Sequence, residues 1–404
     1  MPLIHRACVR RLVAVLVAGV LVSACGGGFD DAPRALGPAG APQSAPGFTS
    51  VVSFGDSLSD VGTYTPATSL SGDGAAPYLG GKFTTNSASA RIWVELVAAS
   101  LGLAVTPAEV GFNGQSQPCP AAAAGPAAAA TCTAYGQGGS RITDPAGIGK
   151  QADGSGALTV PVRSQIANHL ARKGDFKAGD LVFVFAGNND ALLQFGAFAA
   201  TASQINAQVA AGAITADQAQ VQLLTAQVDA DSAVKLAAME LSAAIRSDIL
   251  GRGAVYVAVL NLPDSSATPF GLSLPSDAAR GVLAGLVGTF NPALREGLDL
   301  APVALLDAAA GQRAVIANPA AAGFTEVAVA ACDAAIISAV TGGLVADGSS
   351  LFCNTDPTLP YQALRANANQ DTWFFADGVH PSVGGHRTIA GFVGAELRRV
   401  GWLP

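Results

Sequence analysis

Residues 181–190 read LVFVFAGNND, five apolar residues in a row followed by a turn of small and polar residues. Apolar runs of this length are typical of strands that are buried on both faces, as in parallel sheets. Two similar runs occupy residues 255–260 and 302–306, and a β-rich run at residues 49–54 ends at Gly55. The sequence therefore predicts at least four strands of one buried sheet.

Helical patterns lie between and after these runs. Apolar periodicity predicts helices at residues 90–101, 162–172 and 385–400. A long Ala- and Gln-rich segment precedes residue 255, and Thr215-Ala216-Asp217-Gln218 is a capping box that predicts the start of its second helix. Strands that alternate with helices predict an α/β fold with a mainly parallel sheet, whose ligands bind outside the carboxyl ends of the strands.

Two other stretches have the composition of loops. Residues 65–82 are rich in Gly, Pro, Ser and Thr, which predicts a long surface loop. Residues 118–130 are a low-complexity stretch between two cysteines, which predicts a loop closed by a disulfide.

The amino terminus has the pattern of an export signal. Residues 1–24 combine a basic head with an apolar run at residues 12–22 that is too short to span a bilayer. Val22-Ser23-Ala24-Cys25 resembles a lipobox, after which Cys25 would carry lipid, whereas ordinary cleavage would leave Cys25 unmodified. We expect residues 25–48 to form a flexible linker and residues 49–404 to form one domain.

Composition and charge narrow the classes of partner. Half of the residues are apolar, which suffices for a sizeable core. Without the leader, 19 basic residues face 29 acidic ones, which gives a formal charge of −10. Phosphate binding needs concentrated positive charge, so nucleic acid is not an expected partner.

Four cysteines lie beyond the leader and Cys25, and in principle they allow three pairings. Disulfides are the default in an exported chain. Sequence neighbours pair most simply, which gives Cys119–Cys132 and Cys332–Cys353. A metal site is disfavoured, because the chain has no C-x-x-C or H-x-x-x-H spacing.

Polar residues that could carry chemistry follow the predicted strands. Ser57 comes just past the first strand in Gly55-Asp56-Ser57, and the turn Ala186-Gly187-Asn188-Asn189-Asp190 follows the run at 181–185. An Asn there offers N–H donors to a developing oxyanion, and the glycines of residues 135–140 (YGQGGS) let a main-chain N–H approach a ligand closely. Each motif alone could equally be an ordinary turn.

A fourth motif lies near the carboxyl terminus. Asp377 and His380 are three residues apart, so in a compact turn the carboxylate can reach Nδ1 and leave Nε2 free as a base. A surface turn or half of a metal site are the alternatives. His169 has no adjacent acid and His386 opens the last predicted helix, so His380 is the best candidate base.

Taken together, and in this order, the four motifs resemble the GDSL family of hydrolases, also called SGNH. The resemblance covers most of residues 49–404. It rests on Gly55-Asp56-Ser57-Leu58, the Gly138-Gly139 pair, Gly187-Asn188-Asn189-Asp190 and Asp377-Gly378-Val379-His380-Pro381. Residues 80–86 (GGKFTTN) and 261–264 (NLPD) also resemble bacterial members.

The resemblance implies a three-layer α/β/α fold with a flavodoxin-like sheet and with helical and loop insertions. It implies Ser57 as nucleophile, His380 as base and Asp377 as its partner, with no cofactor. The oxyanion donors would be the Ser57 N–H, a glycine N–H and Asn189. Residues 134–136 read AYG where the family usually has Asn-Tyr-Ala, so the choice between Gly138 and Gly139 stays open.

We therefore expect an exported serine esterase or lipase that acts on small-molecule or lipid esters. A lipid anchor at Cys25 would place it in the outer membrane or periplasm of a bacterial envelope, and without the anchor it would be secreted. A carbohydrate O-deacetylase of the same fold and a non-catalytic ligand-binding lipoprotein are the alternatives.

Overall fold

The computed structural model describes residues 47–69 and 81–404. The expected signal peptide at residues 1–24, Cys25 and most of the linker at 25–48 therefore lie outside the described residues. Within the described part of the chain, no helix combines the length and the apolar character needed to cross a bilayer.

A six-stranded sheet forms the centre of the molecule, and all of its strand pairs are parallel. Its order is β2-β5-β1-β6-β7-β8, so the strands other than β2 have the 2-1-3-4-5 order of a flavodoxin-like sheet. The predicted fold class is thus confirmed. The strands are β1 (Ser50–Gly55), β2 (Thr106–Pro107), β5 (Cys132–Ala134), β6 (Asp180–Phe185), β7 (Tyr256–Leu260) and β8 (Ala304–Leu306).

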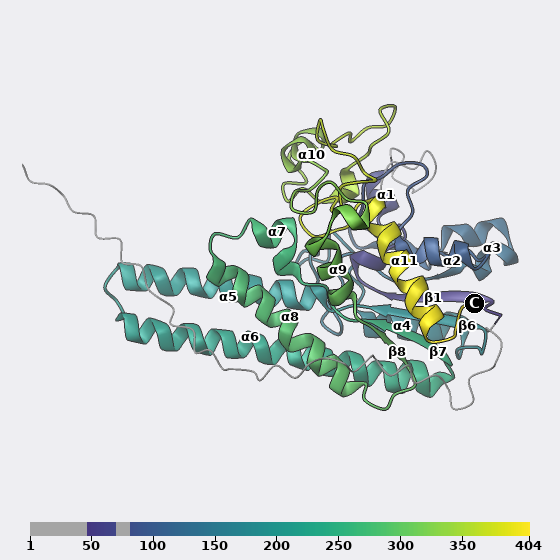
Figure 1. Cartoon of the computed structure of the whole chain (residues 1–404), viewed down its shortest axis with the longest axis horizontal. Helices are drawn as coiled ribbons and strands as arrows, with labels where there is room; N and C mark the ends of the chain where they lie inside the picture. The colour runs from purple at the N-terminus through teal and green to yellow at the C-terminus, as the bar shows by residue number, and fades with distance from the viewer. Residues whose placement is uncertain (1–46, 70–80) are drawn as a thin grey trace, which may run out of the picture.

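Helices cover both faces of this sheet, as Figure 1 shows. One face packs against α4, α5, α6 and α8, and the other packs against α2 and α11. The α-helices are α1 (Thr65–Thr68), α2 (Trp93–Ser100), α3 (Pro126–Ala130), α4 (Val162–Lys173), α5 (Asn188–Ala210), α6 (Ala216–Ala244), α7 (Pro269–Leu272), α8 (Asp277–Gly297), α9 (Ala308–Ala317), α10 (Ala334–Val340) and α11 (Val383–Arg399).

Successive strand residues enter opposite layers of the core. Val182 and Val184 of β6 pack with the α4, α5, α6 and α8 layer, whereas Leu181, Phe183 and Phe185 pack with the α2 and α11 layer. Alternation of this kind follows from the two-residue period of a strand. Because both faces are covered, every residue of β6 is buried, and this explains the uninterrupted apolar run in the sequence.

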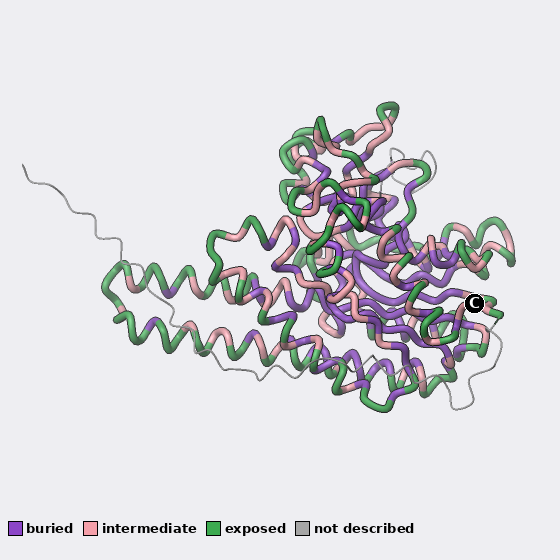
Figure 2. The backbone as a smooth tube through the Cα atoms, viewed as in Figure 1, coloured by how far each residue is buried: buried purple, intermediate pink, exposed green. Residues whose placement is uncertain are grey.

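The helices α5 and α6 extend well beyond the sheet as a hairpin (Figure 1). Its far end is largely exposed in Figure 2. The helix α6 begins after Thr215, whose side chain accepts the Gln218 N–H while the Gln218 side chain accepts the Thr215 N–H. The predicted capping box is therefore confirmed.

The segment 65–82 differs from the predicted surface loop at both of its ends. Thr65–Thr68 form the short helix α1, and Lys82 is buried because its Nζ pairs with both carboxylate oxygens of Glu95 at 2.7 Å. Loop composition alone did not indicate this pairing. Residues 70–80 lie outside the described part of the chain.

Both predicted disulfides form. Cys119 and Cys132 have a Cα–Cα distance of 5.8 Å, and Cys332 and Cys353 have one of 6.1 Å. The first closes residues 118–130, which fold into the short 3-10 helix η2 (Pro120–Ala124) and α3. A separate two-stranded antiparallel hairpin, β3 (Glu109–Phe112) and β4 (Gln115–Pro118), precedes it.

Candidate active site

Ser57 lies where the order of the parallel sheet reverses. The chain leaves β1, places β5 on one side of it and then places β6 on the other side. Such a switch point opens a crevice at the carboxyl ends of the strands. The 3-10 helix η1 (Ser57–Ser59) begins directly after β1, and a Cβ at Gly55 would lie 2.2 Å from the Phe185 carbonyl oxygen. Only glycine fits this turn without a shift of the backbone.

Three side chains from two distant parts of the sequence meet in series at this turn. The Ser57 Oγ lies 2.8 Å from His380 Nε2, and His380 Nδ1 lies 2.8 Å from both Oδ1 and Oδ2 of Asp377. An ionised carboxylate can only accept hydrogen bonds, so Nδ1 carries the proton. The unprotonated Nε2 can then accept the Ser57 hydroxyl proton.

The charge distribution favours this arrangement. Burial disfavours the charge on Asp377, but His380 and the hydrogen bonds to the carboxylate outweigh burial and lower the pKa of Asp377 below its usual value. Burial also disfavours the imidazolium of His380, but the Asp377 charge and its hydrogen bond outweigh burial and raise the pKa of His380. The pair therefore stabilises a proton on His380 once it has been taken up.

Ser57, Gly139 and Asn189, which line one cavity, each have an N–H hydrogen that could bind a ligand. Among the described residues, the main-chain N–H groups of Ser57 and Gly139 make no hydrogen bond. The Gly138 N–H instead donates to Asp60 Oδ2 at 2.9 Å. Asn189 uses one of its two Nδ2 hydrogens to bind the Ser140 carbonyl at 2.8 Å, which leaves the other hydrogen available. Of the two candidate glycines, Gly139 is therefore the one whose amide is free.

A helix terminus and a buried acid complete the turn. The 23-residue helix α5 begins at Asn188, so its positive end faces this crevice. The Asn188 side chain donates to Asp56 Oδ2 at 2.9 Å, and Asp56 Oδ1 accepts the Leu58 N–H at 3.1 Å. Burial raises the pKa of Asp56 despite these hydrogen bonds. Asp56 thus holds the backbone after Ser57 and the side chain of Asn188.

Sequence reasoning missed several residues that hold the site. Asp60 accepts the N–H groups of Gly62, Thr63 and Gly138, and burial raises its pKa to about 6. The ring centroid of Phe83 lies 4.8 Å from that of His380. Phe83 belongs to the GGKFTTN segment, so the family resemblance gave one signal for it, whereas the contact of Asp60 with Gly138 spans 78 positions and has no local signature.

The other two described histidines are structural. His169 is buried on α4 and stacks on Phe176 with ring centroids 4.4 Å apart, and burial lowers its pKa to about 4. The His386 Nδ1 accepts the Trp93 N–H at 3.4 Å, and burial lowers its pKa to about 3. Neither histidine has a carboxylate partner among the described residues, in contrast to His380.

A cavity of about 920 Å³ opens beside the Ser57 hydroxyl. Ser57, Gly139, Asn189 and His380 line one part of it, and most of the remaining wall is apolar. The apolar side chains that line it include Leu192, Phe195, Phe270, Val315, Phe374 and Phe392. The volume is that of a site for a small organic ligand, and the lining is mostly apolar.

Comparison with known protein families gives a match over most of the chain. A family model described as GDSL-like Lipase/Acylhydrolase matches residues 51–392, a span that includes Ser57, Asp377 and His380. A search of curated proteins finds no sequence with a significant match to the chain. Over residues 47–69 and 81–404, no group of three or more His, Cys, Asp or Glu side chains is arranged to hold a metal ion.

Proposed function

The chain belongs to the GDSL-like lipase and acylhydrolase family and is thus a hydrolase of ester bonds; from this we propose that it is a serine esterase that hydrolyses carboxylic acyl esters through Ser57, His380 and Asp377. The observation that carries the proposal is the continuous contact from Ser57 Oγ through the imidazole to the Asp377 carboxylate, with 2.8 Å at each step. This is the geometry that an activated serine nucleophile requires.

In the first step, His380 Nε2 takes the Ser57 proton while Oγ attacks the carbonyl carbon of the ester. The Asp377 carboxylate stabilises the imidazolium that forms. When the tetrahedral intermediate collapses, the bond to the alcohol breaks and His380 gives its proton to the leaving oxygen. The acyl group then remains on Ser57 as an ester.

In the second step, water attacks the acyl group on Ser57. His380 takes a proton from this water and returns it to Ser57 Oγ as the acid leaves. Both steps place negative charge on the carbonyl oxygen. We assign its stabilisation to the N–H groups of Ser57 and Gly139 and to the free Nδ2 hydrogen of Asn189, since these donors have no other partner among the described residues.

The apolar cavity supports an acyl chain as the group that is bound beside Ser57. Burying apolar surface contributes roughly 0.8 kcal/mol per CH₂ group, so a cavity lined by residues such as Phe195, Phe270 and Phe392 favours chains longer than acetyl. A carbohydrate O-deacetylase would instead need polar groups for the sugar and little space for the acyl group. We therefore place the esterase or lipase ahead of the deacetylase.

The decisive experiment compares hydrolysis of nitrophenyl esters of graded chain length by the wild type and by Ser57→Ala. We expect the wild type to prefer chains longer than acetyl and Ser57→Ala to lose turnover. A strict preference for acetyl would favour the deacetylase. If a fluorophosphonate failed to label the folded wild type, or labelled Ser57→Ala equally, the chain would be a ligand-binding protein instead.

We also propose that the enzyme is exported and anchored to a membrane by lipid on Cys25. The two disulfides support an oxidising compartment, and the lipobox at residues 22–25 supports lipidation. Growth of a bacterial expression host with a radiolabelled fatty acid should label the wild type and leave Cys25→Ala unlabelled. An unlabelled wild type found in the medium would show that the protein is secreted without an anchor.

A further inference from the structure

We propose that the Cys332–Cys353 disulfide and the backbone amide of Ser350 position Asp377 for catalysis. Ser350 would act on the reaction through Asp377 and not by contact with the substrate. The inference rests on the esterase activity proposed above. It assigns a role to the loop between Cys332 and Cys353, which has no part in the reaction steps described above.

The Ser350 N–H makes the contact that links this loop to the site. It donates to Asp377 Oδ2 at 2.8 Å. The other carboxylate oxygen, Oδ1, accepts the N–H groups of Val379 and His380 at 3.0 and 2.9 Å, which come from the same turn as Asp377. Among the described residues, Ser350 is therefore the one main-chain donor to Oδ2, and it comes from 27 positions away in the sequence.

Ser350 is itself held from its other side. It is completely buried, and its carbonyl oxygen accepts the Asn86 Nδ2 hydrogen at 2.9 Å and the Cys353 N–H at 3.0 Å. The same Asn86 Nδ2 binds the Thr84 carbonyl at 2.9 Å, so residues 84–86 support this peptide unit. The amide that faces Asp377 thus has little freedom to turn away.

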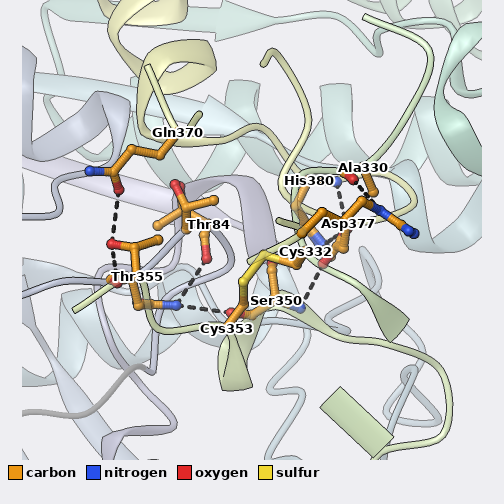
Figure 3. Close-up of a disulfide and its surroundings, with 12 residues drawn as sticks. Thr84, Ala330, Cys332, Ser350, Cys353, Thr355, Gln370, Asp377 and His380 are labelled. Carbon is orange, nitrogen blue, oxygen red and sulfur yellow. Dashed lines mark hydrogen bonds and ion pairs between the residues drawn. A yellow bond between two sulfur atoms is a disulfide. The ribbon is translucent and has the colours of Figure 1, made fainter. Parts of the chain in front are cut away.

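The disulfide joins this peptide unit to the segment that carries Asp377. Cys353 lies three residues after Ser350, and its carbonyl accepts the Asn86 N–H at 2.8 Å. Cys332, at the other end of the bond, donates its N–H to the Ala376 carbonyl at 2.9 Å, directly before Asp377. Figure 3 shows Ser350 and Asp377 side by side next to the sulfur–sulfur bond. The disulfide therefore links the segment of Ser350, which donates to the Asp377 carboxylate, to the segment that holds Ala376 directly before Asp377.

The physical consequence concerns orientation. His380 is held in its productive tautomer and direction only if the Asp377 carboxylate keeps its own direction. An N–H on each oxygen fixes that direction, and it does so before substrate arrives. A misplacement of about 1 Å in a catalytic group can cost roughly 100-fold in rate. Removing the tie should therefore lower kcat even when the chain remains folded.

The second disulfide provides a matched control. Cys119–Cys132 also closes a short loop, with a sequence separation of 13 against 21 for Cys332–Cys353. Cys119 and Cys132 hydrogen-bond to neither Asp377 nor His380. Loss of either bond should destabilise the fold by a similar amount, whereas only one of them should affect the reaction.

The first test measures kcat and KM on a soluble nitrophenyl ester for two double variants of the full chain, Cys332→Ser with Cys353→Ser and Cys119→Ser with Cys132→Ser. We expect kcat to fall on the order of 10-fold or more in the first variant and to stay within about 2-fold in the second. Equal kcat in the two folded variants would overturn the role of the disulfide.

The second test removes only the Ser350 N–H. An ester bond replaces the amide when lactic acid is incorporated at position 350 by nonsense suppression, and Ser350→Ala is its isosteric control that keeps the N–H. We expect kcat to fall about 10-fold relative to Ser350→Ala, the size of one hydrogen bond to a charged group, with KM unchanged. Without this N–H, less of the negative charge on the Asp377 carboxylate is neutralised, so the carboxylate stabilises the imidazolium more strongly. The pKa of His380 should therefore increase, and the acid limb of kcat/KM should move to higher pH.

These outcomes separate the two proposals. If the ester-containing protein matches Ser350→Ala in kcat, or if its acid limb does not move to higher pH, the inference is overturned while the esterase assignment stands. If the wild type hydrolyses no ester and is not labelled by a fluorophosphonate, the esterase assignment and the inference are both overturned. If the Cys332→Ser with Cys353→Ser variant does not fold, the comparison at position 350 decides the inference.

Discussion

The side-chain amide of Asn189 has two hydrogens, and we propose that one serves the fold and the other serves the reaction. One hydrogen binds the Ser140 carbonyl at 2.8 Å, and this bond holds the amide plane next to the loop that carries Gly139. The second hydrogen has no partner among the described residues and lies at the wall of the cavity that contains Ser57. An amide that is oriented in advance can meet developing charge without reorganisation.

Asn189→Ala tests this assignment. We expect kcat to fall about 100-fold or more, because one oxyanion donor is lost, while KM changes little. The measurement is steady-state hydrolysis of a nitrophenyl ester, together with the melting temperature to show that the variant is folded. A folded variant with kcat within about 3-fold of the wild type would exclude Asn189 as a donor.

Asp377→Asn tests the charge on the third member of the series. An Asn can donate to Nδ1 and so favour the tautomer whose Nε2 cannot accept the Ser57 proton, which should lower kcat by about 10⁴-fold. The wild-type kcat/KM should increase with pH through the raised pKa of His380, because only the neutral imidazole acts as base. Without the neighbouring carboxylate, the pKa of His380 should be lower, so the residual activity should persist to lower pH. An acid limb at the wild-type position would contradict this.

The sequence allowed some of these residues to be predicted and not others. Asp377 and His380 lie three positions apart, so their pairing depends on one local turn and could be predicted. Which of Gly138 and Gly139 has a free amide could not be predicted, because this depends on Asp60, whose contact with Gly138 exists only in the folded chain. The contact of Ser350 with Asp377 is non-local in the same way.

At the scale of elements, the buried strands were the easiest to predict. The run at 181–185 and the strand β6 coincide apart from Asp180, because a strand that is covered on both faces must be apolar throughout. The edge strand β2 has two residues and the hairpin of β3 and β4 is largely polar, so neither has an apolar run. The turn at Asn113-Gly114, where both residues have positive φ, is nevertheless a sequence signal for that hairpin.

The start of α6 offers a prediction about a single element. Thr215→Ala removes the N-cap hydroxyl from an exposed helix end, which should cost about 1 kcal/mol locally. Because this end lies at the far tip of the α5–α6 hairpin, we expect faster amide hydrogen exchange in the first turn of α6 and unchanged kcat. Thr225→Ala is the matched control, since the Thr225 hydroxyl binds the Val221 carbonyl within the same helix and caps nothing. Equal exchange in the two variants would contradict the role of the cap.

At the scale of the whole molecule, the site exists only because the sheet is complete. Ser57 and His380 are separated by 323 positions, and the strands β1, β5 and β6 must lie side by side before the first loops can meet. Because the site is built from residues that are far apart in the sequence, activity depends on the folding of the whole domain. Activity should therefore also depend on buried groups far from the substrate, because groups whose protonation differs between the folded and unfolded chain change the stability of the fold.

Two buried histidines should make the fold sensitive to mild acid. The pKa of His169 is lowered by burial to about 4 and that of His386 to about 3, against about 6.5 in an unfolded chain. Between these values the unfolded chain binds more protons than the folded chain, so stability falls as pH decreases below about 6.5. Burial raises the pKa of Asp60 and of Asp190 to about 6, which works in the opposite direction between pH 4 and 6.

Substituting His169→Phe isolates one of these contributions. His169 packs on Phe176 and meets Phe54 and Tyr135 edge to face, so a phenyl ring suits the site and cannot be protonated. Urea titrations at pH 8 and pH 4 measure how far the free energy of unfolding falls between these two pH values. This decrease should be about 2 to 3 kcal/mol smaller in the variant than in the wild type. Asp60, Asp190 and His386 contribute equally to both proteins and cancel in this difference. Parallel pH dependence of the two proteins would show that the fold tolerates a protonated His169.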